Sequence, residues 1–493
     1  MKKPQSHKIQ YPIAFTALLI AMLAASCSVG PNYHRSTVTT PSEFKELAGW
    51  KVAEPSDTLF RGGWWRVYGD SLLDTLESRV AISNQSIAAA CAQYREAIAL
   101  VKSARAGYFP TVSAQGSYTR GQASKNAGIG GITTASSTGS NSMPIVPEYL
   151  LEGNVSWEPD IWGRVRRTVE SDRASAQASA ADLAALCLST QATLAQDYFA
   201  LRVADAQKRL LDTTVLVYKK FLDLTKQRFD QGVASQADVA VAQTQFSSAQ
   251  AQQLDVGVAR SQMEHAVATL IGQPASLFSI EPETLPIPIV VTPPVVPSVL
   301  LERRPDVAAA ERTVAAANAQ IGVAKAAYYP NITLSATGGY ESQTLTNPSW
   351  LIPSASQLWS WTGGLAEQLF TGGLRSAAVE QAKAAYEAQV ATYRQTVLAA
   401  FQNVEDNLAA LRILELEADS QDSAVSAAAR STAVVIDQYK QGTVSALNVI
   451  TTQTIELSNK EASVALLGKR IAASVQLIES IGGGWSSDSL KKL

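Results

Sequence analysis

Two short stretches of the chain match each other and decide how the rest folds. Residues 228–238 read RFDQGVASQAD, and residues 438–448 read QYKQGTVSALN. In each stretch a glycine closes a long segment free of helix breakers, as expected where a helix ends in a left-handed residue. A serine three positions later suits the N-cap of a returning helix. Each stretch therefore predicts a helix–turn–helix tip.

The match between the two stretches extends far beyond the tips. From position 163 to position 272, the sequence resembles itself 210 residues later without a gap. Matched pairs are Gly163 and Gly373, Val169 and Val379, Leu201 and Leu411, Gly232 and Gly442, and Gly272 and Gly482. A constant register of this length indicates a tandem duplication. We expect repeats at 80–272 and 300–482, joined by a Pro-rich linker at 273–299.

Each repeat contains two segments in which apolar and polar residues alternate. After Pro110, Val112, Ala114 and Tyr118 are interleaved with serine, threonine and glutamine, and a similar pattern follows Pro330. A period of two predicts β-strands. The expected strands lie at about 110–120 and 148–160 in the first repeat and at about 330–340 and 357–370 in the second.

Long helices are predicted after the second strand of each repeat. Residues 164–231 contain no Pro and no Gly, so a single helix there would be about 100 Å long. We expect helices at about 164–231 and 233–271 in the first repeat and at about 374–441 and 443–481 in the second. The combined length of the helix before the first strand, at about 81–107, and of the helix at 233–271 is nearly that of the long helix. We therefore expect these two to stack end to end beside it.

The strands have the length that a tilted strand needs to cross the hydrocarbon of a membrane. Tyr149, Trp157, Trp359 and Trp361 suit an aromatic belt at the membrane interface. Four strands cannot close a barrel, and open sheet edges are not tolerated in lipid. A membrane location therefore requires several chains to share one barrel. The alternative is a small soluble sandwich with one wet face.

The N-terminus has the features of a targeting segment. Basic residues precede an apolar run that ends in small residues before Cys27, which fits a secretory signal at 1–26. The residues before Cys27 resemble a bacterial lipobox, so we expect Cys27 to be acylated and the protein to be located in the outer membrane. Ordinary cleavage that leaves an unmodified cysteine is the alternative. Residues 27–79 would form a lipidated segment and an equatorial region, and 483–493 a C-terminal tail.

Composition argues against several classes of function. The formal net charge is -2, which leaves no basic excess for nucleic acid. No metalloprotease, phosphate-loop or dinucleotide motif is present, and His34 and His265 are the only histidines after the signal. We therefore expect neither catalysis nor a metal or cofactor. Cys91 and Cys187 lie in Ala-rich helical patterns and are expected to be buried thiols.

Several motifs together resemble outer membrane efflux proteins of the TolC type, in the lipoprotein branch of multidrug (RND) efflux systems. They are CSVGPNY at 27–33, GWW at 63–65, WEPDIWGRVRR at 157–167, LERRPD at 301–306 and ANAQIG at 317–322. The resemblance covers nearly the whole chain after the signal, although Pro159 replaces an aliphatic residue that is usual in the family. It implies an α+β membrane protein without enzymatic activity.

The resemblance also implies an assembly. Three chains would form a homotrimer with a 12-stranded β-barrel in outer-membrane lipid and an α-helical barrel in the periplasm. The tips would dock on a periplasmic membrane-fusion adaptor that couples to an inner-membrane pump, for export of drugs or other small molecules. Two alternatives stay open, namely a duct for polypeptide (type I) secretion and a non-conducting trimeric structural lipoprotein.

The same resemblance assigns roles to residues at the tips. Adaptor contact is implied for Arg228, Gly232, Ser235, Gly442 and Ser445. A role in a periplasmic gate is implied for three other tip residues, Asp238, Tyr439 and Asn448. In that gate Asp238 and Tyr439 would tie the closed entrance by a hydrogen bond. The simpler interpretation is that both motifs serve only to form the helix turns.

Overall fold

The computed structural model describes residues 29–38, 40–41, 43–47, 63–122, 145–283, 303–342 and 354–487. The predicted signal at 1–26, the acylation site Cys27 and most of the linker at 273–299 lie outside the described residues. The described chain divides into two compact units. The first comprises parts of 1–34, 98–174 and 315–388, and the second comprises parts of 35–97, 175–314 and 389–493.

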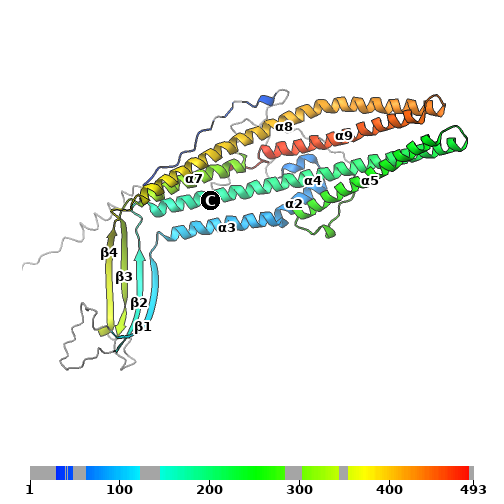
Figure 1. Ribbon diagram of the computed structural model, residues 1–493. Helices are drawn as coiled ribbons and strands as arrows, with labels where there is room; N and C mark the ends of the chain where they lie inside the picture. Colours follow the sequence, from blue (N-terminus) through cyan, green and yellow to red (C-terminus); the bar gives the residue numbers. More distant parts are fainter. Residues whose placement is uncertain are drawn as a thin grey trace, which may run out of the picture. The chain divides into compact units, whose positions relative to one another are not determined.

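The elements follow the same order in both repeats (Figure 1). The strands are β1 (Thr111–Gln122), β2 (Ile145–Trp157), β3 (Asn331–Ser342) and β4 (Gln357–Ala366). The helices are α2 (Ser71–Ser83), α3 (Gln85–Ala106), α4 (Arg164–Asp230), α5 (Gln236–Leu270), α7 (Pro305–Ala326), α8 (Leu374–Lys440) and α9 (Ala446–Ser480). Short 3-10 turns are η1 (Lys45–Leu47), η3 (Trp64–Tyr68), η4 (Ala275–Leu277) and η6 (Ser354–Ser356).

The first unit contains one antiparallel sheet whose strands lie in sequence order, β1-β2-β3-β4. Pairing of β2 with β3 joins the two repeats. The second strand ends at Trp157, earlier than expected, because Pro159 lacks an N–H and the Asp160 carboxylate accepts hydrogen bonds from the first turn of α4, at Val165 N and Arg166 N. The outer strands β1 and β4 leave an unpaired edge within the described residues.

In the second unit the shorter helices meet end to end, as their lengths predicted. The Asn84 side-chain amide, at the start of α3, donates to the Leu270 carbonyl at the end of α5 over 2.8 Å. In the second repeat Arg304 donates to the Ser480 carbonyl over 2.9 Å. Asn84 also accepts from Ile87 N and so separates α2 from α3, which interrupts the helix predicted at about 81–107.

The glycines after α5 and α9 are required by these junctions. Gly272 and Gly482 have φ of 69° and 96°. A Cβ on Gly272 would lie 2.3 Å from the Ser83 carbonyl oxygen, and one on Gly482 would lie 2.1 Å from the Arg303 carbonyl oxygen. Only glycine combines this backbone conformation with so close an approach. The duplicated glycines therefore fix the same joint in both repeats.

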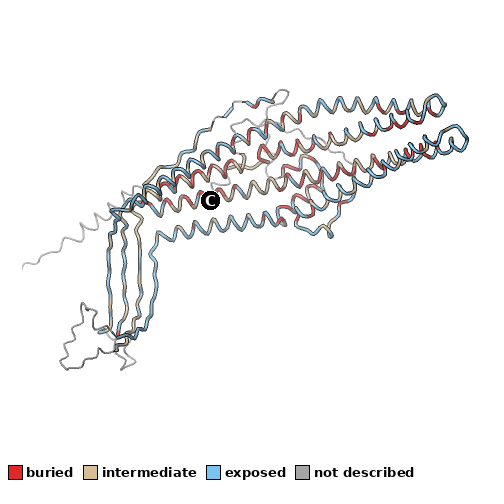
Figure 2. The backbone as a smooth tube through the Cα atoms, in the orientation of Figure 1, coloured by how far each residue is buried: buried red, intermediate tan, exposed pale blue. Residues whose placement is uncertain are grey.

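The main hydrophobic core of the second unit forms around η3 and α2. It gathers Trp64, Trp65, Tyr68, Leu73, Leu76 and Val80 with Tyr198, Leu201, Val267, Ile471 and Val475 of the long helices and with Ile271, the C-cap of α5. Figure 2 shows that the buried residues of this unit lie along the helices. At the start of α2, the Asp70 carboxylate caps Leu72 N and Leu73 N and accepts from the Tyr198 hydroxyl over 2.5 Å. These contacts attach α2 to α4.

One acidic side chain of α2 is buried without a partner. Glu77 is fully inaccessible to solvent, and neither of its carboxyl oxygens has a hydrogen-bond partner among the described residues. Burial raises its pKa to about 9, because the charged form loses its hydration. Glu77 is therefore protonated at neutral pH.

The expectation that both cysteines are buried is wrong for Cys91. Cys91 is exposed on α3 and Cys187 is half-buried on α4, and both are free thiols. Ala-rich helical sequence did not distinguish the solvent-facing side of α3 from its packed side. Among the described helices, none has the length and apolar character needed to cross a membrane.

Candidate functional site

The sheet of the first unit has one apolar face. The strand register aligns the alternating residues of all four strands on the same side. This face carries Val112, Ala114, Gly116, Tyr118, Tyr149, Leu151, Gly153, Val155, Trp157, Ile332, Leu334, Ala336, Gly338, Tyr340, Trp359, Trp361, Gly363 and Leu365. Trp359 and Trp361 are 73% and 75% exposed. A continuous exposed apolar surface of this kind marks contact with a partner or a membrane.

The opposite face of the sheet is mostly polar. It carries serine, threonine, glutamine and asparagine at the intervening positions, such as Ser113, Asn154 and Thr362. Asn154 links two strands, because its side-chain oxygen accepts from the Thr337 hydroxyl over 2.7 Å. Figure 2 shows β1 and β4 exposed along most of their lengths. In the described chain the sheet thus separates an apolar from a polar surface without forming a core of its own.

The four predicted belt residues lie at different heights on the apolar face. Tyr149 is near the outer end of β2, where its ring lies 4.9 Å from the ring of Tyr118. Trp157 ends β2, and its indole N–H donates to the Tyr108 carbonyl over 3.0 Å. Trp359 and Trp361 lie on β4 and are paired with Gly338 and Ala336. Their role as a membrane belt stays a prediction.

The helix–turn–helix tips belong to the second unit. Gly232 and Gly442 have φ of 75° and 79°. At the first tip Val233 N donates to the Arg228 carbonyl, and at the second Thr443 N donates to the Gln438 carbonyl. These bonds satisfy carbonyls at the helix ends, as glycine C-caps do. The two hairpins, α4 with α5 and α8 with α9, end on the same side (Figure 1).

The two returning helices begin differently. Ser235 and Asp238 form a capping box, in which Asp238 N donates to the Ser235 hydroxyl and Ser235 N donates to the Asp238 carboxylate. Ser445 occupies the N-cap of α9, but its side chain makes no capping hydrogen bond. The third helical residue there is Asn448, which is exposed. The first tip is therefore the better capped of the two.

Arg228 joins the two tips. Its Nη1 donates to the Tyr439 carbonyl over 2.7 Å, and its guanidinium carbon lies 4.5 Å from the centre of the Tyr439 ring. Tyr439 is buried and also packs against Phe221, with ring centres 5.4 Å apart. A cation at this point complements the negative C-terminal end of α8. The family resemblance predicts adaptor contact for Arg228, and nothing in the sequence pattern indicates this contact with Tyr439.

Asp238 and Tyr439 form no hydrogen bond with each other within the chain. The Asp238 carboxylate accepts from Ser235 N and Oγ, whereas the Tyr439 hydroxyl is buried and has no partner among the described residues. Tyr439 instead belongs to a cluster with Phe221, Leu222, Ala242, Ala446, Val449 and Ile450. The single chain therefore holds Tyr439 by packing and by Arg228.

The sheet and the tips present different kinds of surface. Within the described ranges, no group of three or more His, Cys, Asp or Glu side chains is placed to hold a metal ion. The tips offer helix ends, an aromatic cluster and one guanidinium, which suit docking and closure. The sheet offers two surfaces of opposite polarity.

Comparison with known proteins agrees with this architecture. The outer membrane efflux protein family matches residues 76–273 and 296–483. The chain is 28% identical over 474 residues to the pyoverdine export outer membrane protein OpmQ of Pseudomonas aeruginosa, covering 95% of this chain and 96% of OpmQ. It is 25% identical over 470 residues to the probable outer membrane lipoprotein SilC of Salmonella typhimurium, covering 94% and 97%. The solved outer-membrane channel OprN superposes with a TM-score of 0.84 at 26% identity, covering 93% of this chain and 100% of OprN.

Proposed function

The chain belongs to the outer membrane efflux protein family, and we propose that it serves as the trimeric exit duct of a tripartite pump. It is an efflux duct of the outer membrane. In the proposal, three copies close a 12-stranded barrel. The helical hairpins pass drugs or other small molecules from a periplasmic adaptor and an inner-membrane pump to the exterior, and the duct itself carries out no chemistry.

The observation that carries this proposal is the sorting of side chains by the sheet. The register places most apolar residues of the four strands on one face and mostly polar residues on the other, where Leu150 and Leu358 are apolar exceptions. An apolar face toward lipid and a polar face toward a water-filled lumen are what a membrane barrel requires. On β4, for example, Trp361 lies on the apolar face and its neighbour Thr362 lies on the polar face.

The sheet edges support completion by sister copies. β1 and β4 are each paired on one side only among the described strands, and unpaired edges are not tolerated in lipid. Large apolar side chains are exposed near both edges, with Phe109 69% exposed before β1 and Phe370 91% exposed after β4. Pairing β4 of one chain with β1 of the next would cover both edges and close a ring.

The tips support docking and gating. Gly232 and Gly442 are exposed at the turns, with open space around a Cβ on Gly232, so a partner can approach the backbone closely. We assign adaptor contact to the turn residues, including Ser235 and Ser445, and gating to Asp238, Tyr439 and Asn448. Arg228 serves both groups, because it lies at a tip and holds Tyr439. Acylation of Cys27 would anchor the chain in outer-membrane lipid.

The two faces of β4 provide the test. Trp361→Arg places a charge on the apolar face, and Thr362→Arg places the same charge on the polar face one residue away. We expect Trp361→Arg to prevent barrel insertion and efflux, measured by heat-resistant migration and by drug accumulation in cells. Thr362→Arg should insert and retain efflux. Equal tolerance of both variants would contradict a lipid-facing apolar surface.

A further inference from the structure

The N-terminal residues of the described chain are bound by a single arginine. Arg167, in the first turn of α4, is 3% exposed. Its Nε donates to the Val29 carbonyl over 3.2 Å, and its Nη2 donates to the Gly30 carbonyl over 3.3 Å and to the Asn32 side-chain oxygen over 2.9 Å. Its Nη1 pairs with Glu170 over 2.7 Å. Four of the five N–H donors of the guanidinium are thus used.

The same residues are also held from α7, in the second repeat. The Asn318 side-chain amide donates to the Pro31 carbonyl over 3.0 Å. Gly30 has φ of 105°, and a Cβ on it would lie 2.5 Å from Gly322 Cα. A Cβ on Gly322 would lie 2.8 Å from Arg167 Cγ. Two glycines therefore allow the segment, α4 and α7 to approach one another.

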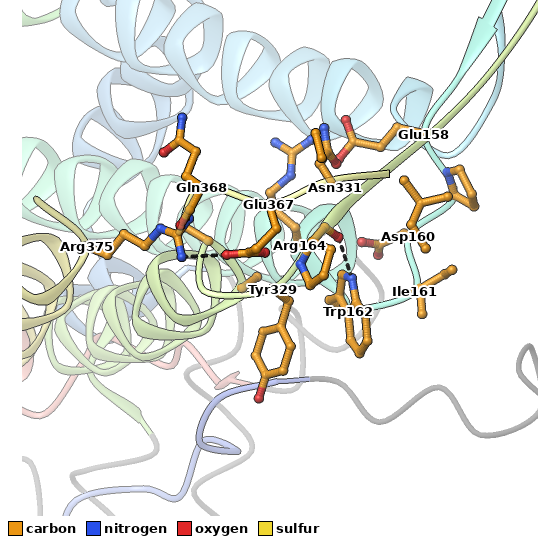
Figure 3. Close-up of a pocket in the computed structure, with 16 residues that line it drawn as sticks. Glu158, Asp160, Ile161, Trp162, Arg164, Tyr329, Asn331, Glu367, Gln368 and Arg375 are labelled. Atoms are coloured by element: carbon orange, nitrogen blue, oxygen red, sulfur yellow. Dashed lines mark hydrogen bonds and ion pairs between the residues drawn. The ribbon is translucent and has the colours of Figure 1, made fainter. Parts of the chain in front are cut away.

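A third contact places the segment beside the sheet. Val29 N donates to the Trp162 carbonyl over 3.2 Å. The Trp162 indole N–H donates to the Pro330 carbonyl over 2.8 Å, and its ring stacks on Tyr329 with centres 4.8 Å apart (Figure 3). Trp162 follows β2, whereas Pro330 immediately precedes β3. The segment therefore lies where β2 and β3 enter the sheet.

We propose that residues 29–32 form a strap that binds a composite site made of Arg167, Asn318 and Gly322, and that this strap ties the two repeats together at the feet of β2 and β3. The strap connects α4 to α7, the helices that continue β2 and β3. It also limits where a lipid anchor can lie, since two residues of chain reach at most about 7 Å between Cys27 and Val29. The statement about the lipid anchor depends on the proposed function, whereas the strap proposal does not.

Release of the strap is measured by trypsin cleavage after Arg35, in full-length protein extracted from membranes. With the strap docked, the bond after Arg35 resists cleavage, because a protease needs the residues on both sides of that bond, Asn32 of the strap among them, to detach locally. We expect Arg167→Gln to raise the cleavage rate by about tenfold or more, since most of the hydrogen bonds to the strap are lost. Arg167→Lys should behave similarly, because one ammonium cannot replace the planar fork.

Gly30→Val provides a test that leaves α4 and α7 unchanged. It should release the strap even if the Arg167 variants fail to fold. The matched control is Arg164→Gln, which removes an exposed arginine that pairs with Glu158 at the start of the same helix. The control should keep the wild-type rate. Wild-type cleavage rates in Gly30→Val and in the folded Arg167 variants would overturn the strap. Efflux is measured in a separate assay. A wild-type protein that exports nothing would contradict the proposed duct function but would not affect the strap proposal.

Discussion

Arg228 of the first repeat donates a 2.7 Å hydrogen bond to the main-chain carbonyl of Tyr439 in the second. The same guanidinium lies 4.5 Å from the centre of the Tyr439 ring. One side chain thus makes a charged hydrogen bond and a cation–π contact between the hairpin tips. The Tyr439 hydroxyl, which the family resemblance assigned to the gate, is left without a partner among the described residues.

The first prediction concerns this contact. Arg228→Gln removes the cation and should weaken the tip contact by about 2 kcal/mol, given the usual size of cation–π contacts and charged hydrogen bonds. That corresponds to a leak about 30-fold larger, measured as conductance of the resting channel in a planar bilayer. Lys440→Gln is the control, because Lys440 pairs only with the exposed Asp437 in the described contacts. Equal conductance in both variants would refute the assignment.

A second prediction separates gating from helix capping at Asp238. Ser235→Ala and Asp238→Ala each break the capping box and should destabilise the start of α5 by about 1 kcal/mol. If Asp238 also ties the entrance between chains, only Asp238→Ala increases uptake of large antibiotics. Antibiotic susceptibility of cells that carry each variant decides the point. If the two variants are equally susceptible, Asp238 acts only in helix capping and not in the gate.

A third prediction follows from the raised pKa of Glu77. The unfolded chain releases this proton near pH 4.3, whereas the folded chain retains it up to about pH 9. Between these values the unfolded state binds fewer protons, so stability falls as pH rises. A glutamine side chain cannot ionise, so Glu77→Gln should remove this loss. Relative to wild type, its effect on the free energy of unfolding should be about 3 kcal/mol more favourable at pH 7 than at pH 4.

The measurement for Glu77 is the denaturation midpoint of wild type and Glu77→Gln in detergent between pH 4 and pH 9. The two curves should diverge as pH rises. Asp74→Asn, on the same helix, is the control for a change of charge on α2. Parallel curves for wild type and Glu77→Gln would show that Glu77 is ionised in the folded protein.

A fourth prediction uses the glycines of the first repeat. Gly272→Ala should destabilise the junction of α3 and α5, because its φ is 69° and its Cβ would lie 2.3 Å from the Ser83 carbonyl. Gly257→Ala, inside α5 and in open space, should stabilise the helix by up to about 1 kcal/mol. Thermal unfolding followed by circular dichroism compares them. Stabilisation by both substitutions would mean that the junction relaxes freely.

The sequence predicted the features that depend on local pattern. Alternation after Pro110 indicated β1, and the absence of Pro and Gly over 164–231 indicated α4. It missed the break at Asn84, although asparagine is a favoured N-cap, because the apolar pattern continues across it. Pattern alone also placed Cys91 inside, since alanine is common on both sides of these helices.

Contacts between residues far apart in the chain could not be read from the sequence. Arg228 and Tyr439 are separated by 211 positions, and Arg167 binds Val29 across 138. The residue types at these positions carry no signal of their partners. The motif around Arg167 carries the family resemblance, but its contacts depend on the packing of the N-terminal residues against α4, and those of Arg228 on the packing of the two tips.

Completion of the sheet by sister copies is the central claim, and cross-linking of the sheet edges tests it most directly. Cysteines are placed in β1 at Ser113 and in β4 at Ser360 or Thr362, with Cys91→Ser and Cys187→Ser removing the free thiols. Oxidation in membranes should give covalent species of two and three chains and none larger, because a ring of three is closed. Chains that stay single at every pair, or a ladder that continues beyond three, would contradict the account.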